Sequence, residues 1–164
     1  MMRGLAIRCL VIVLMLVGCV PGELPVAEEP EPAAFPVLLD LTDLSDCQRD
    51  TALQAMEQWN SAVGAPVFAE GEGKVVLTSE AYPDAFIYTD GDLESGATMY
   101  LGHNLPAGWE PYECSWRASI AFELGRLIGV PEDDYEFSLM NFGPAPNGMV
   151  LPVHVEIVRE LMAP

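Results

Sequence analysis

The stretch that decides the fold of this 164-residue chain is Ala121-Phe122-Glu123-Leu124-Gly125-Arg126-Leu127-Ile128-Gly129-Val130-Pro131-Glu132. It belongs to a predicted helix over 115–128, in which apolar side chains recur with the period of one helix face. Gly129 ends this helix, because glycine readily takes the left-handed conformation found at helix C-termini. Pro131 then prevents the helix from resuming. The apolar positions of the helix are Trp116, Ile120, Leu124, Leu127 and Ile128.

Working outward, the sequence upstream predicts a first helix. Ser45 or Asp46 can cap its N-terminus, and it runs to about Val63, where Gly64 ends it. An apolar stripe with helical spacing supports this prediction. The stripe consists of Ala52, Ala55, Met56, Trp59 and Val63.

Short strands are predicted at 37–41, 74–78, 85–89 and 98–101. Turn-rich segments separate them, including Asp90-Gly91-Asp92.

Downstream of the quoted stretch, a loop rich in Gly, Pro and Asn covers 141–149. Pro152 opens a final helix to about Met162, since proline is favoured in the first helical turn.

The N-terminal residues 1–18 have the pattern of a signal peptide, with Arg3 and Arg8 ahead of an apolar run over 9–17. The run ends in Leu16-Val17-Gly18-Cys19, which resembles the lipobox of bacterial lipoproteins. The resemblance implies cleavage before Cys19 and a diacylglycerol on its thiol. An ordinary secretory signal is the alternative, but Leu16 fits poorly the two small residues which that cleavage needs. By analogy with a sorting rule of some Gram-negative bacteria, Val20 rather than Asp after the cysteine favours the outer membrane.

After the signal, the chain divides into a tether and a domain. Residues 19–36 hold the lipid-bearing cysteine, followed by five prolines and four glutamates with little to bury, which predicts a disordered acidic tether. At about 3 Å per residue the tether reaches roughly 50 Å. Residues 37–164 are long enough to bury one core.

Composition narrows the partners. The chain has a formal net charge of −18, and the signal peptide carries two of its seven basic residues and none of its twenty-five acidic ones, so the mature charge is −20. Nucleic acid is therefore excluded as a partner, because its phosphates would be repelled. An anionic membrane surface would repel the domain too, so the lipid on Cys19 must provide the anchor.

Four cysteines are present, of which Cys9 leaves with the signal and Cys19 is lipidated. Cys47 and Cys114 remain, and in an exported domain two cysteines most simply form one disulfide. A metal pair is the alternative, although neither cysteine belongs to a CxxC motif.

Three stretches, with the order of the predicted elements, resemble the metzincin zinc proteases, in particular the matrixin-like ones. They are Ala55-Met56-Glu57-Gln58-Trp59-Asn60, the quoted stretch 121–132, and Ser138-Leu139-Met140-Asn141, which is similar to the family's Met-turn. The resemblance implies an α+β fold: a twisted mixed sheet of four to five strands, packed by two long helices, plus a C-terminal helix. It also implies that the two long helices lie side by side, which makes a Cys47–Cys114 disulfide reasonable.

The family's zinc motif is H-E-x-x-H-x-x-G-x-x-H, in which three histidines bind zinc and the glutamate handles the proton of the metal-bound water. Glu123 and Gly129 match this motif, but the ligand positions hold Phe122, Arg126 and Glu132. Phenylalanine cannot bind zinc, and an arginine stays protonated and offers no lone pair. Glu123 is then a vestigial general base, and Met140 a hydrophobic floor that needs no metal.

Two pairings are open for Arg126. One is an ion pair with Glu132 where the zinc would sit, with Phe122 filling the remaining space. The other is a pair with Glu123 three residues earlier on the helix surface. The only histidines, His103 and His154, are expected to lie on the surface or to be hydrogen-bonded, since their spacing does not suggest a relocated metal site.

The sequence therefore favours a non-catalytic, metzincin-like lipoprotein that acts as a binding or structural module at the cell envelope, with no cofactor. The resemblance implies a cleft where the family binds its substrate, rimmed by an edge strand near 98–101. This cleft is expected to accept an extended peptide or an envelope protein. The alternative is an active metallopeptidase with an unconventional metal site, for which zinc would be required. A structural surface protein without a specific ligand is a third possibility.

Overall fold

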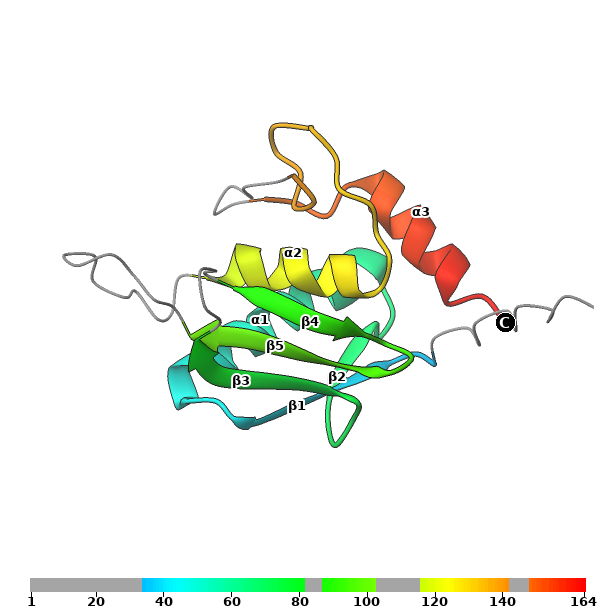
Figure 1. The fold of residues 1–164 in the computed structure, drawn as a ribbon. Coiled ribbons are helices and arrows are strands. Elements are labelled where there is room, and N and C mark those ends of the chain that lie inside the picture. The colour runs from blue at the N-terminus through cyan, green and yellow to red at the C-terminus, as the bar shows by residue number, and fades with distance from the viewer. Residues whose placement is uncertain (1–33, 82–86, 103–115, 142–147) are drawn as a thin grey trace, which may run out of the picture.

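The computed structural model describes residues 34–81, 87–102, 116–141 and 148–164. They form an α+β fold with one five-stranded sheet, two main helices and a C-terminal helix (Figure 1). This confirms the predicted fold class. The elements are β1 (Val37–Asp43), α1 (Asp46–Val63), β2 (Phe68–Glu70), β3 (Val75–Ala81), β4 (Tyr88–Asp92), β5 (Gly96–Gly102), α2 (Arg117–Leu127) and α3 (Pro152–Leu161).

The sheet is mixed, with strand order β2-β1-β3-β5-β4. β1 pairs in parallel with β2 and β3, β3 pairs in parallel with β5, and β4 alone runs antiparallel to its neighbour. Along β1 the side chains of Val37, Leu39 and Leu41 are buried, whereas Leu38 between them is 40% exposed. The helices therefore cover one face of the sheet (Figure 1).

Helix α1 forms as the sequence predicts. Ser45 caps it in a reciprocal box with Gln48, in which each side chain accepts a hydrogen bond from the other residue's backbone N–H. Gly64 ends the helix with a φ of 77°. The predicted apolar stripe is buried, and its Trp59 is fully enclosed.

Helix α2 also ends where the quoted stretch predicts. Gly129 has a φ of 87°. Its N–H donates to the Arg126 carbonyl, and the Val130 N–H donates to the Gly125 carbonyl. This pair of bonds is the Schellman arrangement, in which a left-handed glycine lets the chain fold back over the last turn of a helix. The predicted opening of α3 at Pro152 is likewise confirmed.

Two predictions about the sheet are wrong. The strand near 98–101 does not rim the sheet, because β5 lies between β3 and β4 and the edge strand on that side is β4. Asp90-Gly91-Asp92 is part of β4 rather than a turn: Gly91, with a φ of 95°, pairs closely with β5, and the turn follows Asp92, which accepts from the Ser95 N–H. Part of the predicted strand 85–89 lies outside the described residues.

One strand, β2, was not predicted from the sequence. It is only three residues long, and α1 supplies much of what holds it. The Asn60 side chain accepts from the N–H groups of Val67 and Phe68 and donates to the Phe68 carbonyl. Such support from a distant side chain leaves no periodic signal in the strand itself.

Over the part of the chain that the structure describes, no helix is long and apolar enough to cross a membrane.

Candidate functional site

The residues that the resemblance places at the metzincin zinc positions lie around the C-terminal half of α2 and the turn after it. Phe122 and Arg126 are four residues apart on α2, and Glu123 follows Phe122. The side chains of Phe122 and Glu123 are buried, each with 7% of the residue exposed. Glu132 comes after the Gly129 turn, which directs the chain back over the helix. Helix spacing and one left-handed glycine thus bring these four residues together.

Arg126 lies between two carboxylates. Its Nη1 is 3.2 Å from Glu123 Oε1, and its Nε is 3.3 Å from Glu132 Oε1. Both pairings that the sequence left open are therefore present at once. The two pairs differ in environment, since the Glu123 side chain is 9% exposed and the Glu132 side chain 45%. An exposed pair contributes about 0–1 kcal/mol, whereas a buried carboxylate depends much more on its partner.

These residues do not fit a zinc ion. Phe122 has no donor atom, and the Arg126 guanidinium places a positive charge against the two carboxylates that remain. Among the described residues, no group of three or more His, Cys, Asp or Glu side chains is placed to hold a metal ion. Glu123, which the resemblance places at the general-base position, forms an ion pair within its own helix.

Met140 and Gly125 form a packed floor where α2 meets α1 and the Met140 turn. Met140 is fully buried. A Cβ added to Gly125 would lie 2.5 Å from Met140 Sδ and 2.6 Å from Trp59 Cζ2, so α2 meets α1 and the Met140 turn at the one position without a side chain. Trp59 also donates from Nε1 to the Ala121 carbonyl, at 2.7 Å. Gly125 is thus a packing requirement here.

A buried polar network lies next to this floor and links three segments. His154, 2% exposed, accepts at Nδ1 from the Leu151 N–H, so its Nε2 carries the proton donated to Asp133 Oδ2 at 2.8 Å. Ser138 Oγ donates to the same oxygen at 2.7 Å and accepts from the Met140 N–H. The network therefore joins α3, the turn after α2 and the Met140 turn.

Electrostatics at Asp133 follow from these contacts. Burial acts to raise the pKa of Asp133, but hydrogen bonds from Ser138, His154 and the Tyr135 N–H outweigh it, so that its pKa lies below the ordinary value of 3.8. Asp133 is therefore an ionised carboxylate held in a largely enclosed position.

A serine, a histidine and an aspartate in contact raise the question of a hydrolytic triad. In such a triad the histidine bonds to the serine, which it activates as a nucleophile. Here Ser138 and His154 both donate to Asp133, and Ser138 is fully buried. The arrangement crosslinks the fold and does not activate a nucleophile. His154 is thus hydrogen-bonded, one of the two outcomes expected from the sequence, and it is buried rather than on the surface.

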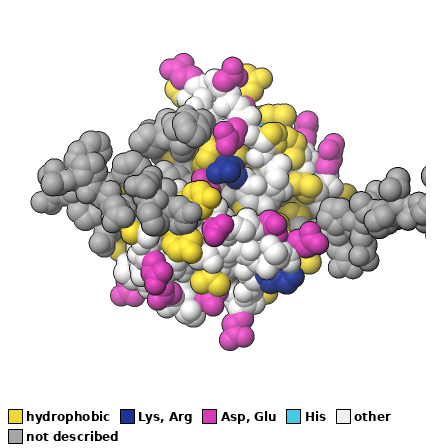
Figure 2. Space-filling view, in the orientation of Figure 1, with side chains coloured by type: hydrophobic (Ala, Val, Ile, Leu, Met, Phe, Trp, Pro, Cys, Tyr) yellow, Lys and Arg dark blue, Asp and Glu magenta, His cyan; other side chains and the backbone are white. Residues whose placement is uncertain are grey.

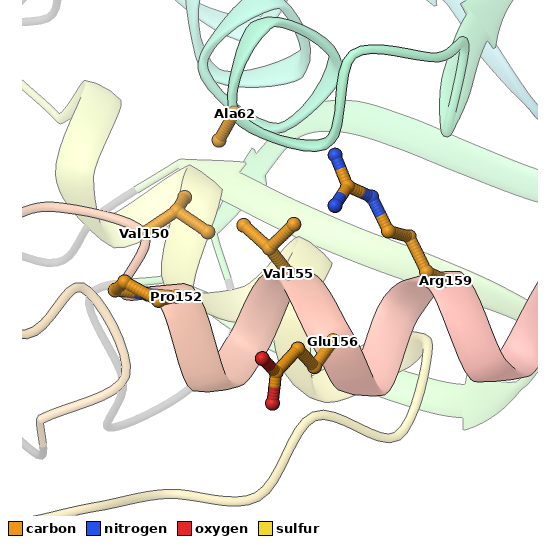
Figure 3. Close-up of a pocket in the computed structure, with 6 residues that line it drawn as sticks. All are labelled: Ala62, Val150, Pro152, Val155, Glu156 and Arg159. Atoms are coloured by element: carbon orange, nitrogen blue, oxygen red, sulfur yellow. The ribbon is translucent and has the colours of Figure 1, made fainter.

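A pocket of about 350 Å³ opens between α1 and α3 (Figure 3). Arg159 at its rim points toward α1 and donates to the Val63 carbonyl, where it caps that helix. The pocket is lined by Ala62, Val150, Pro152, Val155, Glu156 and Arg159. None of these residues was a candidate in the sequence.

The remaining candidates lie partly outside the described residues. Cys47 is disulfide-bonded, and the other cysteines all lie outside the described part, so its pairing with Cys114 stays a prediction. The lipidation residue Cys19 and His103 are also outside it. Asp133 and Ser138 flank or belong to quoted motifs, but only contact with His154 reveals their joint role.

No protein-family model matches the chain, and no curated protein matches it.

Proposed function

We propose that this protein is a non-catalytic, metzincin-like lipoprotein that serves as a binding or structural module at the bacterial cell envelope. The observation that carries the proposal is the position of Arg126, within ion-pair distance of both Glu123 and Glu132. In the family that the sequence resembles, these three positions hold the general base and two zinc ligands. Here they form a charge-paired cluster, which crosslinks the helix to the chain after Gly129 without a metal.

The buried floor supports the same proposal. Met140, Gly125 and Trp59 pack closely and the Asp133 network is satisfied, so the region around the former site is built as a stable core. A scaffold of this kind can hold a binding surface in place. It supplies no activated water or nucleophile from the residues described above.

An extended peptide is the partner we propose for the sheet. β4 is an edge strand and pairs only with β5 among the described strands. An edge offers backbone groups to an added strand, and alternate side chains of that strand would provide specificity. The lipid on Cys19 and the acidic tether would hold this surface near the membrane. Val20 after the cysteine favours the outer membrane.

The test is zinc content. The full chain, produced in zinc-supplemented medium, is expected to retain far less than stoichiometric zinc by mass spectrometry of the metal. The matched variant is Phe122→His/Arg126→His/Glu132→His, which rebuilds the complete motif around Glu123. We expect it to bind zinc stoichiometrically, because the glycine turn already brings the third position back to the helix.

Two results would contradict the proposal. Stoichiometric zinc in the wild-type chain, lost on Glu123→Ala or Glu132→Ala, would indicate the metallopeptidase alternative. A folded triple-histidine variant with no gain in zinc would show that the three positions do not have the metzincin arrangement. Circular dichroism of the variant establishes that it is folded.

A further inference from the structure

Large apolar side chains are exposed on one part of the molecule outside the candidate site. Tyr135 is 61% exposed and Phe137 63%, and both belong to the loop that follows α2. Exposed apolar patches mark interaction sites in soluble domains. The surface, which we call the α3 apolar surface, consists of Tyr135, Phe137, Met149, Val153 and Leu161.

Hydrogen bonds connect the two parts of the chain that form the α3 apolar surface, namely the loop after α2 and the segment with Met149 and α3. The Met149 N–H donates to the Phe137 carbonyl at 2.9 Å, and the His154–Asp133 bond fixes the start of α3 against the same loop. On α3, Val153 and Leu161 stand eight residues apart with half-buried Ile157 between them, so the three form one row along the helix. His154 and Val158 occupy the buried side instead.

The charges around this surface have one sign. Residues 130–164 contain six acidic side chains and one arginine, Arg159. That arginine is hydrogen-bonded to the Val63 carbonyl at the end of α1. Asp134, Glu136, Glu156 and Glu160 are exposed. In Figure 2, magenta carboxylates lie beside yellow apolar side chains at the top of the view, over the loop that follows α2.

We propose that the α3 apolar surface docks an amphipathic helix of another protein, whose apolar stripe is flanked by Lys or Arg. A row of apolar side chains four residues apart is the complement of a second helix. The acidic rim selects a basic flank and rejects an acidic one. An anionic membrane would meet the same repulsion from this rim. The surface uses no residue of β4 or of the Arg126 cluster, so this proposal and the proposed function can fail independently.

A model peptide tests the proposal directly. The full chain is placed in phosphatidylcholine nanodiscs and titrated against a fluorescent amphipathic helix of Leu and Lys, with empty nanodiscs as the blank. Anisotropy is expected to show saturable binding. The double variant Phe137→Ser/Val153→Ser should weaken this binding at least tenfold, and so should Glu156→Lys/Glu160→Lys. Neither pair lies in the core, and circular dichroism verifies the fold.

Matched controls separate this surface from general attraction to an acidic chain. Leu38→Ser removes an exposed apolar side chain on the sheet, and Glu72→Lys/Glu94→Lys makes the same charge change on loops between strands. Both should leave affinity unchanged. Equal weakening by the two charge-reversal pairs would mean non-specific attraction and would overturn the proposal. So would binding no stronger than to empty nanodiscs, which is the membrane outcome, or equal binding of a Leu and Glu peptide.

Discussion

Arg126 stands between a buried carboxylate and an exposed one, and the two contacts have unequal importance. Glu123 is largely removed from water, so the guanidinium is its compensating charge. Glu132 remains about half exposed and can be hydrated instead. A long side chain with a branched head satisfies both partners, which explains why the sequence could not choose between them.

Substitution should expose this inequality. Arg126→Ala is expected to cost about 1–3 kcal/mol in the free energy of unfolding, because it leaves the Glu123 carboxylate buried without its partner. Glu132→Ala should cost only about 0–1 kcal/mol. Urea titrations measure both, and a double-mutant cycle gives the coupling between the two residues. Strictly additive losses would show that the Arg126–Glu132 bridge has no energetic role.

The substitution Gly125→Ala tests the packing of α2, because the sign of the change in stability depends on that packing. In an exposed helix, Gly→Ala stabilises by about 1 kcal/mol, because alanine loses less backbone entropy. Gly125→Ala should instead destabilise by about 1–3 kcal/mol, since its Cβ would lie too close to Met140 and Trp59. Thermal unfolding distinguishes the two. A rise in melting temperature would mean that α2 does not meet the Met140 turn at this glycine.

At the scale of elements, α3 is attached through the Asp133 network as well as by apolar packing. His154 accepts a hydrogen bond from the Leu151 N–H at the start of α3 and donates one to Asp133 in the turn after α2. The same turn carries Glu132. Ser138 connects the same aspartate to the Met140 turn. The C-terminal helix and the turn that carries Glu132 therefore share one half-buried carboxylate, that of Asp133.

The pH dependence of stability follows from that carboxylate. The folded pKa of Asp133 lies below its unfolded value of about 3.9, so its contribution is fully present above roughly pH 4 and is lost as the pH falls through the folded pKa. The stability difference between wild type and Asp133→Asn should therefore shrink as the pH falls below about 4. Ser138→Ala removes one hydrogen bond and should move this loss to higher pH. A difference independent of pH would rule out the network as drawn.

At the scale of the whole molecule, the sheet order determines which surface is free. The chain places β5 between β3 and β4, so β4 and not the strand near 98–101 offers its edge. The α3 apolar surface comes from the last two segments of the chain. Under the proposed function, the anchored protein would present two separate surfaces to envelope partners.

Anchoring itself is tested at Cys19. Cys19→Ala is expected to abolish incorporation of radiolabelled palmitate and to leave the signal uncleaved by the lipoprotein route. Cys9→Ala, which keeps the same apolar core of the signal, should be labelled normally. Labelling that survives Cys19→Ala would exclude this residue as the lipidation site. Fractionation of the labelled protein then distinguishes the inner from the outer membrane.

The sequence by itself determined the local elements, because their causes are local. The Ser45 cap, the Trp59 stripe, the Gly129 stop and the Pro152 start are set by neighbouring residues, and the structure has each of them. The resemblance to the metzincins also implied which residues occupy the family's ligand positions. Short or glycine-containing strands carried too little signal, so β2 was missed and β4 was placed three residues too early.

Only the tertiary structure decided what these residues contact. That Arg126 pairs with Glu132 as well as with Glu123 depends on how far the Gly129 turn folds back, and periodicity does not encode that distance. Buried His154 finds Asp133 twenty-one residues earlier in the chain, since packing of α3 brings them together. Strand order likewise comes from long-range pairing, which is why the free edge belongs to β4.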